Sequence, residues 1–273
     1  MPFTFSHPAA VLPLIARGRG RGPLVAAALV AGSTVPDAPY FADSVVPGAF
    51  GLGAVTHAWW GVATVDVLLA AAAVALWRGL LREPLLALLP ARWAAVAALP
   101  APAALRSPRQ VWWFAVSAAV GAATHVGWDA FTHPGRAGAR LFPALEHTVV
   151  AGRPLYTAVQ YGSSAVALGV LVLWLVREVR RRSADGAAAA VVPALGARAR
   201  WAVFCWIGAA AAVGTVLRIV RWSRLPGDAP AFELVPTVAF GSLAGAGAAL
   251  LVYGAVYRLA RGKGLARRYG RAA

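Results

Sequence analysis

The chain has 273 residues, of which 60% are hydrophobic and only 13% are charged, and its mean hydropathy is +0.65. Soluble domains usually carry about 25% charged residues, so this composition argues against a soluble protein and for a membrane protein. The net charge of +16 would suit a nucleic-acid-binding protein, but the basic residues stand in short blocks between apolar runs. We therefore expect no nucleic-acid partner. The single cysteine, Cys205, excludes a disulfide framework and a cysteine-based zinc motif.

Apolar runs predict an all-α, polytopic membrane protein with about 5–7 membrane helices, because roughly 20 mainly apolar residues cross a bilayer as a helix. Five runs are long enough: 54–77, 111–131, 157–176, 201–220 and 235–257. Before them, the shorter runs 8–16 and 23–35 are expected to form a tight helical hairpin or two half-helices. The stretch 85–104 is apolar but contains three prolines. It is expected to lie in the interface or to enter the membrane partway, and whether it crosses stays open.

The basic residues predict the orientation of these spans. If 54–77 runs from outside to inside and the later spans alternate, most arginines and lysines fall on the inner side. The outer segments then hold few: Arg136, Arg140, Arg153, Arg218, Arg221 and Arg224. This distribution follows the positive-inside rule. We therefore expect a single helical membrane domain over 1–257 and a basic cytoplasmic tail over 258–273 that lies against anionic lipid headgroups.

Ionisable residues inside membrane segments are costly unless they are paired or face a polar cavity. In the orientation given above, six histidine and aspartate residues fall on the outer side: His7, Asp37, His57, His125, Asp129 and His133. His7 reaches this side only if the run 8–16 goes inward and the run 23–35 returns. Such a concentration of polar groups in an apolar chain predicts a site at the outer face.

The spacing of these residues suits a metal ion. His125 and Asp129 are about 40° apart on a helix, so both side chains can meet at one ion. His133 precedes Pro134 and Gly135, where a helix is expected to end, so it can fold back. Imidazole and carboxylate together suit zinc, manganese or iron better than calcium. The sequence therefore predicts one or two divalent ions, most readily zinc.

Other polar and aromatic residues are not expected to be ligands of this site. Asp66 is nine residues from His57 and faces the opposite side of a helix, so it is excluded as a ligand and read as a packing or supporting group. Glu146 and His147 are expected in a solvated loop. The tryptophans near the membrane ends, Trp128 among them, are expected to be interfacial belt residues.

Two classes of function fit these observations. One is a metal-dependent hydrolase at the extracytoplasmic face, in which the metal activates water. Its substrate would be a phosphoester or lipid-linked compound, bound with the help of Arg136, Arg140 and Arg153. Asp129 or Asp37 would be a bridging ligand or a base, and these roles stay open. The other is a non-enzymatic membrane protein with a structural metal or a hydrogen-bonded His/Asp cluster. A metal or proton carrier is the weaker third alternative, because the inner halves of the spans are nearly bare of polar groups.

Several motifs carry a family resemblance. They are the opening segment 1–13, Gly32 to Tyr40, Thr56-His57, Gly121 to Gly135 and Gln160 to Ser164. Together they resemble a bacterial membrane family called domain of unknown function 4184. The resemblance covers nearly the whole chain and implies a multi-pass protein of the bacterial inner membrane; the charge distribution given above adds a cytoplasmic C-terminus. It implies no known activity.

A more distant similarity is to inner-membrane proteins described as metal-dependent hydrolases, and to the ligand order of zinc phospholipase C and the P1-type nucleases. This similarity implies that the metal ligands are His7, Asp37, His57, His125, Asp129 and His133. The chain departs from that pattern because Glu146-His147 stands where a His-x-x-x-Glu pair would be, and because it lacks an N-terminal tryptophan. One or two ions are therefore expected instead of three.

Overall fold

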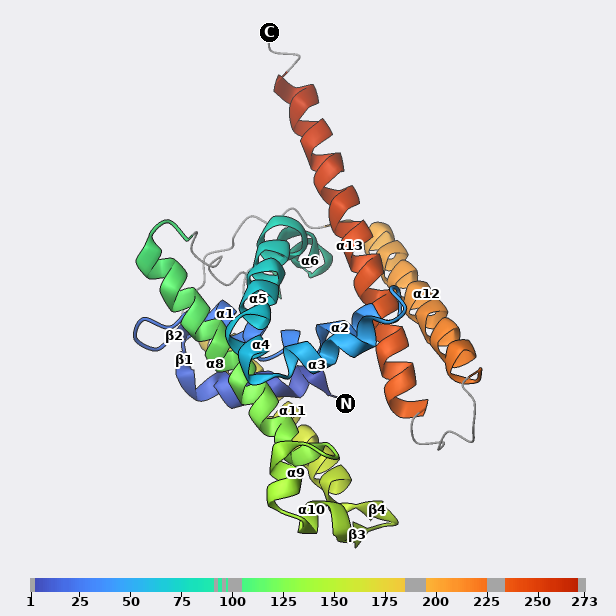
Figure 1. Ribbon diagram of the computed structural model, residues 1–273. Coiled ribbons are helices and arrows are strands. Elements are labelled where there is room, and N and C mark those ends of the chain that lie inside the picture. Colours follow the sequence, from blue (N-terminus) through green and yellow to red (C-terminus); the bar gives the residue numbers. More distant parts are fainter. Residues whose placement is uncertain are drawn as a thin grey trace. The chain divides into compact units, whose positions relative to one another are not determined.

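The computed structural model describes residues 3–90, 93–94, 97, 105–184, 195–224 and 234–269. Within these residues nearly all regular structure is helical, and the strands form two short antiparallel pairs (Figure 1). The all-α prediction is confirmed. The chain divides into two compact units, which are described separately below.

The first unit comprises Met1–Tyr40, Gly48–Val74 and Pro102–Arg181. Its N-terminal elements are the 3-10 helix η1 (Thr4–Leu14), the hairpin β1 (Ile15–Ala16) and β2 (Arg19–Gly20), α1 (Ala26–Gly32), the 3-10 turn η2 (Val35–Asp37) and the start of α2 (Ala38–Ala42). Next come η3 (Ala49–Leu52), α3 (Gly53–Thr56), α4 (Trp59–Ala63) and most of α5 (Val65–Leu76). The last part contains α8 (Pro108–Thr132), α9 (Ala137–Leu141), α10 (Ala144–His147), the hairpin β3 (Val149–Val150) and β4 (Arg153–Pro154), and nearly all of α11 (Leu155–Ala184).

The expected N-terminal helical hairpin has a different local structure. Pro8 and Pro13 lie inside η1, and each removes a backbone donor, which accounts for a 3-10 helix in place of an α-helix. The turn after it is a β-hairpin, in which Arg17 and Gly18 have positive φ angles of 51° and 74°. The run 8–16 is therefore a 3-10 helix and a strand, and the run 23–35 contains α1 and the start of η2.

Helix α8 is the continuous helix that the run 111–131 predicts. It begins after Ser107, whose hydroxyl accepts a hydrogen bond from the Gln110 amide, and Pro108 occupies its first turn. It packs against α1 at two glycines: a Cβ on Gly32 would lie 2.1 Å from the Ala118 carbonyl oxygen, and one on Gly121 would lie 2.3 Å from that of Leu29. These close contacts fix the level of α8 relative to α1 and to the turn that follows α1.

The run 54–77 does not form one continuous helix, and the prediction of a single span there is wrong in this respect. Three short helices, α3, α4 and α5, divide it. The Thr56 hydroxyl donates to the carbonyls of Pro36 (2.6 Å) and Gly53 (3.3 Å), and His57 leaves helical geometry with φ −99° and ψ 5°. The chain then turns so tightly that a Cβ on Gly61 would lie 1.9 Å from the Val55 carbonyl oxygen. Side-chain bonds to the backbone compete here with the helix, which hydropathy alone does not reveal.

The second unit comprises Phe41–Pro47, Ala75–Ala101 and Arg182–Ala273. It contains a π-helical turn η4 (Trp77–Leu81), α6 (Arg82–Leu88), α12 (Ala197–Trp222) and α13 (Leu234–Tyr269). Helices α12 and α13 approach closely at Gly214, Gly241 and Gly245, as small residues permit in membrane helix pairs. Arg218 and Arg221 of α12 both bind the buried Asp43 carboxylate at 3.0 Å.

Three helical segments are long and apolar enough to cross a membrane: Leu155–Ser183, Ala197–Trp222 and Leu234–Arg261. They contain the predicted runs 157–176, 201–220 and 235–257. Helix α8 is continuous but is not among them, so the expected count of about 5–7 membrane helices is not confirmed. Of the stretch 85–104, α6 covers the first residues and most of 91–104 lies outside the described residues. Helix α13 continues to Tyr269, so much of the expected tail 258–273 is helical.

Candidate metal centre

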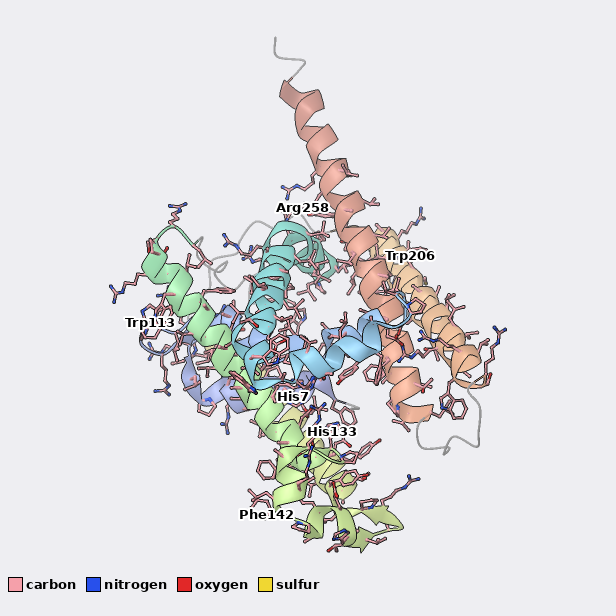
Figure 2. All side chains as sticks on the ribbon, in the orientation of Figure 1. His7, Trp113, His133, Phe142, Trp206 and Arg258 are labelled. Atoms are coloured by element: carbon pink, nitrogen blue, oxygen red, sulfur yellow. The ribbon has the colours of Figure 1, made fainter. Side chains whose placement is uncertain are left out.

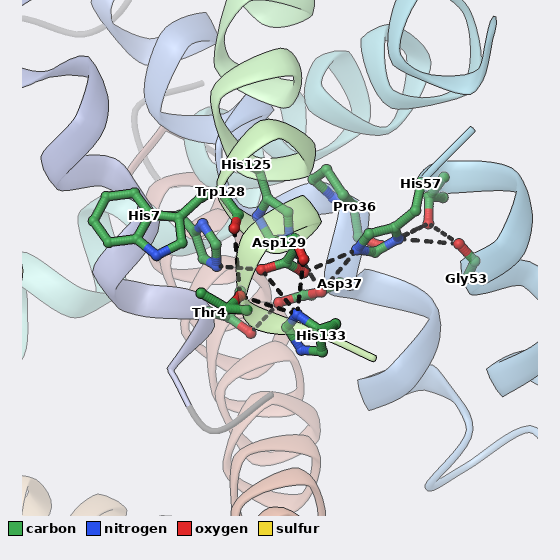
Figure 3. Close-up of polar contacts among 12 residues, drawn as sticks. Thr4, His7, Pro36, Asp37, Gly53, His57, His125, Trp128, Asp129 and His133 are labelled. Atoms are coloured by element: carbon green, nitrogen blue, oxygen red, sulfur yellow. Dashed lines mark hydrogen bonds and ion pairs between the residues drawn. The ribbon is translucent and has the colours of Figure 1, made fainter. Parts of the chain in front are cut away.

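Four of the six predicted ligands come together at one point in the first unit. Asp37 ends the turn η2, His57 follows α3, and His125 and Asp129 lie one turn apart on α8. One ligand atom from each lies within 4.8 Å of the other three, and all four residues are buried (Figure 3). Segments separated by up to 92 residues thus bring four side chains to a single cluster, which we call the four-atom cluster.

The spacing within the four-atom cluster is that of metal ligands. Nε2 of His57 lies 3.6 Å from Asp37 Oδ1 and 3.4 Å from Asp129 Oδ2. Nε2 of His125 lies 3.3 Å and 3.5 Å from the same two oxygens. Ligands at 2.0–2.1 Å from a tetrahedral zinc ion are separated by about 3.3–3.4 Å. These distances are longer than good hydrogen bonds, and they leave room for an ion between the four atoms.

The two histidines present the nitrogen that a metal needs. His57 Nδ1 lies 3.0 Å from the Gly53 carbonyl oxygen, and His125 Nδ1 lies 2.8 Å from that of Ser33. Because a carbonyl only accepts, each Nδ1 donates to its carbonyl, and Nε2 is the ring atom left to face the carboxylate oxygens. Both Nε2 atoms are buried and have no hydrogen-bond partner among the described residues. A backbone carbonyl that fixes the imidazole in this way is typical of metal-binding histidines.

The carboxylate of Asp37 is also fixed by a hydrogen bond to the oxygen that does not face the cluster. The Thr4 hydroxyl donates to Asp37 Oδ2 at 2.6 Å, which leaves Oδ1 for the cluster. Pro36 fixes the turn before Asp37, and the Thr56 hydroxyl binds the Pro36 carbonyl at 2.6 Å. Of the threonines that precede histidines, Thr56 thus supports the centre, whereas the Thr124 hydroxyl donates to the Gly121 carbonyl of its own helix.

His7 and His133 lie on the other side of Asp129. His7 Nε2 and His133 Nδ1 are each 3.6 Å from Asp129 Oδ1, whereas Oδ2 faces the four-atom cluster (Figure 3). Figure 2 labels both histidines on the ribbon of the whole chain. Burial, and then the neighbouring His125, lower the pKa of His7 to about 4, and burial also lowers the pKa of His133. Both imidazoles are therefore neutral at pH 7, the form in which histidine binds metals.

The remaining candidates lie outside the four-atom cluster. Asp66 is not one of its members, although its side chain is fully buried and its two oxygens have no hydrogen-bond partner among the described residues. Glu146 and His147 lie in the short helix α10 and not in a loop; Glu146 Oε1 accepts from the Gly135 amide at 2.8 Å, and His147 is exposed to solvent as expected. Arg140 Nε donates to the Gly135 carbonyl. Of Arg136, Arg140 and Arg153, Arg136 lies beside Tyr40 and hydrogen-bonds its hydroxyl.

Three supporting residues were missed by the sequence reasoning or assigned another role. Thr4 and Gln160 were not predicted, although both stand in segments that carry the family resemblance, which was the available signal. Gln160 Nε2 lies 3.0 Å from His133 Nε2. Trp128 was expected in an interfacial belt, but its Nε1 donates to Ser163 Oγ at 3.1 Å and its ring lines a small cavity with His7, Asp129 and His133.

The fold and the site together define a class: a helical protein with membrane-spanning candidates and a buried His/Asp cluster that could hold a metal ion. Residues 1–257 match the family described as a domain of unknown function (DUF4184), and the chain belongs to that family. No curated protein and no solved structure matches the chain. The family prediction made from the motifs is thus confirmed, and the chemistry must be argued from the site.

Proposed function

We propose that this protein is a metal-dependent hydrolase of the bacterial inner membrane, with its active site at the extracytoplasmic face. The observation that carries the proposal is the pair of buried Nε2 atoms without hydrogen-bond partners among the described residues, each facing the same two carboxylate oxygens. A donor set of two imidazoles and two carboxylates favours zinc over calcium or magnesium. Such an ion polarises a phosphoryl or carbonyl oxygen and lowers the pKa of a bound water to about 7.

The substrate class that we favour is a phosphoester in a lipid or lipid-linked compound. Arg136 hydrogen-bonds Tyr40, whose ring centroid lies 5.6 Å from that of His57, so a guanidinium stands close to the four-atom cluster. Guanidinium groups bind phosphate oxygens strongly. Exposed apolar side chains that stand within two residues of the predicted ligands in the sequence, namely Phe5, Trp59 and Phe131, are suited to a lipid environment. In this scheme Asp37 or Asp129 takes a proton from the attacking water.

One observation favours the non-enzymatic alternative. The four-atom cluster supplies four protein ligands, and zinc sites closed by four protein ligands are usually structural, whereas catalytic sites keep a position open. A structural ion would join the η2 turn, α3 and α8 without turnover.

Metal analysis and turnover separate these possibilities. The protein purified in detergent should contain a stoichiometric transition metal, which is lost in the double variant His125→Ala/Asp129→Ala and retained in His147→Ala, a matched change at an exposed histidine. If the double variant does not fold, chelation of the wild type and the single variant His57→Gln give the same comparison. If the protein holds no metal after zinc reconstitution, and chelation leaves its thermal stability unchanged, both the metal-dependent hydrolase and the structural metal site are excluded.

If metal is present, hydrolysis of a chromogenic phosphodiester and of phospholipid in mixed micelles is measured next. The hydrolase is supported if His57→Gln has no turnover, and if the chelated wild type regains turnover only when metal is added. A stable, metal-loaded protein that hydrolyses neither a phosphodiester, a phospholipid nor a carboxyl ester supports the structural alternative. Arg136→Ala, compared with Arg140→Ala, should raise KM for phosphoesters but not for carboxyl esters.

A further inference from the structure

We propose that the centre takes a second divalent cation, held by Asp129 Oδ1, His7 Nε2 and His133 Nδ1, with Asp129 bridging the two ions. This deepens the proposed function and rests on it, because the first ion occupies the four-atom cluster. The two oxygens of Asp129 face different partners. Oδ2 lies 3.4 Å and 3.5 Å from the two Nε2 atoms of the cluster, and Oδ1 lies 3.6 Å from each atom of the second set.

The stacking of two imidazoles sets the distance between the two positions. The rings of His7 and His125 are parallel to within 19°, and their centroids are 3.7 Å apart. Each ring directs its Nε2 to a different oxygen of Asp129. Two ions bound by these nitrogens would therefore lie about one ring spacing apart. Two-metal hydrolytic sites have their ions about 3.5–4 Å apart, which is the same spacing.

There is room for a ligand on the second side. A cavity of about 10 Å³ is lined by Thr4, His7, Asp129 and His133, among others. This is about the volume that one water molecule needs. Nδ1 of His7 is also buried without a hydrogen-bond partner among the described residues, so the protein does not fix this ring by a hydrogen bond of its own. Unlike the four-atom cluster, the second set supplies three protein ligands and leaves a position open towards the cavity. Three protein ligands and one open position are the arrangement of catalytic zinc sites.

Gln160 is the positioning residue of this second site. Its amide faces His133 Nε2 at 3.0 Å and can present either its NH₂ group or its carbonyl oxygen. If the NH₂ group donates, His133 Nδ1 carries the proton and points it at Asp129. If the carbonyl accepts, Nε2 carries the proton and Nδ1 keeps a lone pair for the cation. A bound cation selects the second arrangement, so Gln160 governs the affinity of the second ion without touching it.

The number of ions per chain tests the proposal. The zinc-reconstituted full chain in detergent should bind two ions, and His7→Ala should bind one, while His147→Ala still binds two. With Mn²⁺ as the probe, the wild type should give the exchange-coupled electron paramagnetic resonance spectrum of neighbouring ions, and His7→Ala the spectrum of an isolated ion. One ion with an uncoupled spectrum in the wild type overturns the second site and leaves the proposed function standing. No ion overturns both.

A second, more conservative variant tests the site even if His7→Ala does not fold. Gln160→Leu should weaken binding of the second ion by about 10–100-fold, as removal of a group that orients a ligand typically does, and leave the first ion in place. Gln110→Leu, at the distant start of α8, is the matched control and should retain both affinities. Two equally tight ions in Gln160→Leu, or two ions in His7→Ala, would overturn the assignment of these residues.

Discussion

Thr4 links the N-terminal 3-10 helix to the metal centre through one hydrogen bond. Its hydroxyl donates to Asp37 Oδ2 at 2.6 Å, and both side chains are buried. Thr4→Val keeps the shape but removes the donor, so Asp37 is free to rotate and one of its oxygens loses its partner. We expect metal affinity to fall about 10–100-fold, measured by competition with a chromogenic chelator.

The control for this change is Thr64→Val. The Thr64 hydroxyl binds the Trp60 carbonyl at 2.7 Å in an exposed position outside the metal centre. Its removal should leave metal affinity within twofold of the wild type. Equal affinities in both variants would show that Asp37 needs no support from η1.

The lowered pKa of His7 predicts how the stability of the metal-free protein changes with pH. Its pKa in the folded state is about 4, below the value of 6.5 for a free histidine, because burial opposes the charged form. Between these values the unfolded chain binds a proton that the folded chain does not, so stability falls as the pH is lowered from 6.5 towards 4. The loss attributable to His7 is at most about 3 kcal/mol.

The unfolding temperature of the protein in detergent with a chelator, measured from pH 7.5 to pH 4.5, tests this dependence. His7→Gln lacks the titrating group, so its unfolding temperature should fall less over the same interval. Parallel curves for the two proteins would assign the acid sensitivity to other groups. Above pH 7 the contribution of His7 is constant, so the difference between the proteins should not change there.

At the scale of elements, the packing of α8 on α1 sets the position of His125 and Asp129 along α1, and so relative to the η2 turn that carries Asp37. Gly121→Ala would place a Cβ 2.3 Å from the Leu29 carbonyl oxygen and 2.8 Å from the Ser33 amide nitrogen, so the two helices must separate. Such overpacking typically costs about 1–3 kcal/mol. The shift would also move His125 relative to the Ser33 carbonyl that holds its Nδ1. We expect a lower unfolding temperature and a lower metal content.

Gly127 offers the matched control on the same helix. A Cβ at Gly127 meets no atom within 4 Å, and alanine favours the helix over glycine by up to about 1 kcal/mol. Gly127→Ala should therefore be neutral or stabilising and keep its metal. A variant Gly121→Ala that is as stable and as metal-rich as Gly127→Ala would contradict the view that this contact positions the site.

The same helix illustrates how far the sequence could predict the site. Two local properties made α8 and its two ligands predictable from the sequence. They are the i, i+4 spacing of His125 and Asp129 and the helix-ending Pro134. The break in the helix at His57 could not be predicted in this way, because it depends on the Thr56 hydroxyl, which donates to the carbonyl of Pro36, 20 residues earlier. A hydropathy pattern contains no information about such a long-range contact.

Supporting groups were harder to predict than ligands for a related reason. Aspartate and histidine are rare in this chain, so their positions alone drew attention to the site. Thr4 and Gln160 are ordinary polar residues, and they acquire a role only when the folded chain brings them to Asp37 and His133. Backbone carbonyls such as those of Ser33 and Gly53 have no side-chain signature at all.

At the scale of the whole molecule, the positive-inside distribution predicts that the metal centre faces the extracytoplasmic side. Helix α11 connects a hairpin that follows the site, β3 and β4, to the arginine-rich segment at its other end. Its segment Leu155–Ser183 is long and apolar enough to span the membrane. The hairpin and the end of α11 at Ser183 are therefore expected on opposite sides.

Single cysteines placed at the two ends of α11 test this orientation in intact cells. The native Cys205 is first replaced in Cys205→Ala, after which Val149→Cys and Ser183→Cys, both at exposed positions, are compared. A membrane-impermeant maleimide should label Val149→Cys at once and Ser183→Cys only after permeabilisation, because the arginines beside Ser183 are retained on the cytoplasmic side. The reverse pattern would place the metal centre in the cytoplasm and exclude an extracytoplasmic substrate. Labelling of both cysteines in intact cells would mean that α11 does not cross the membrane.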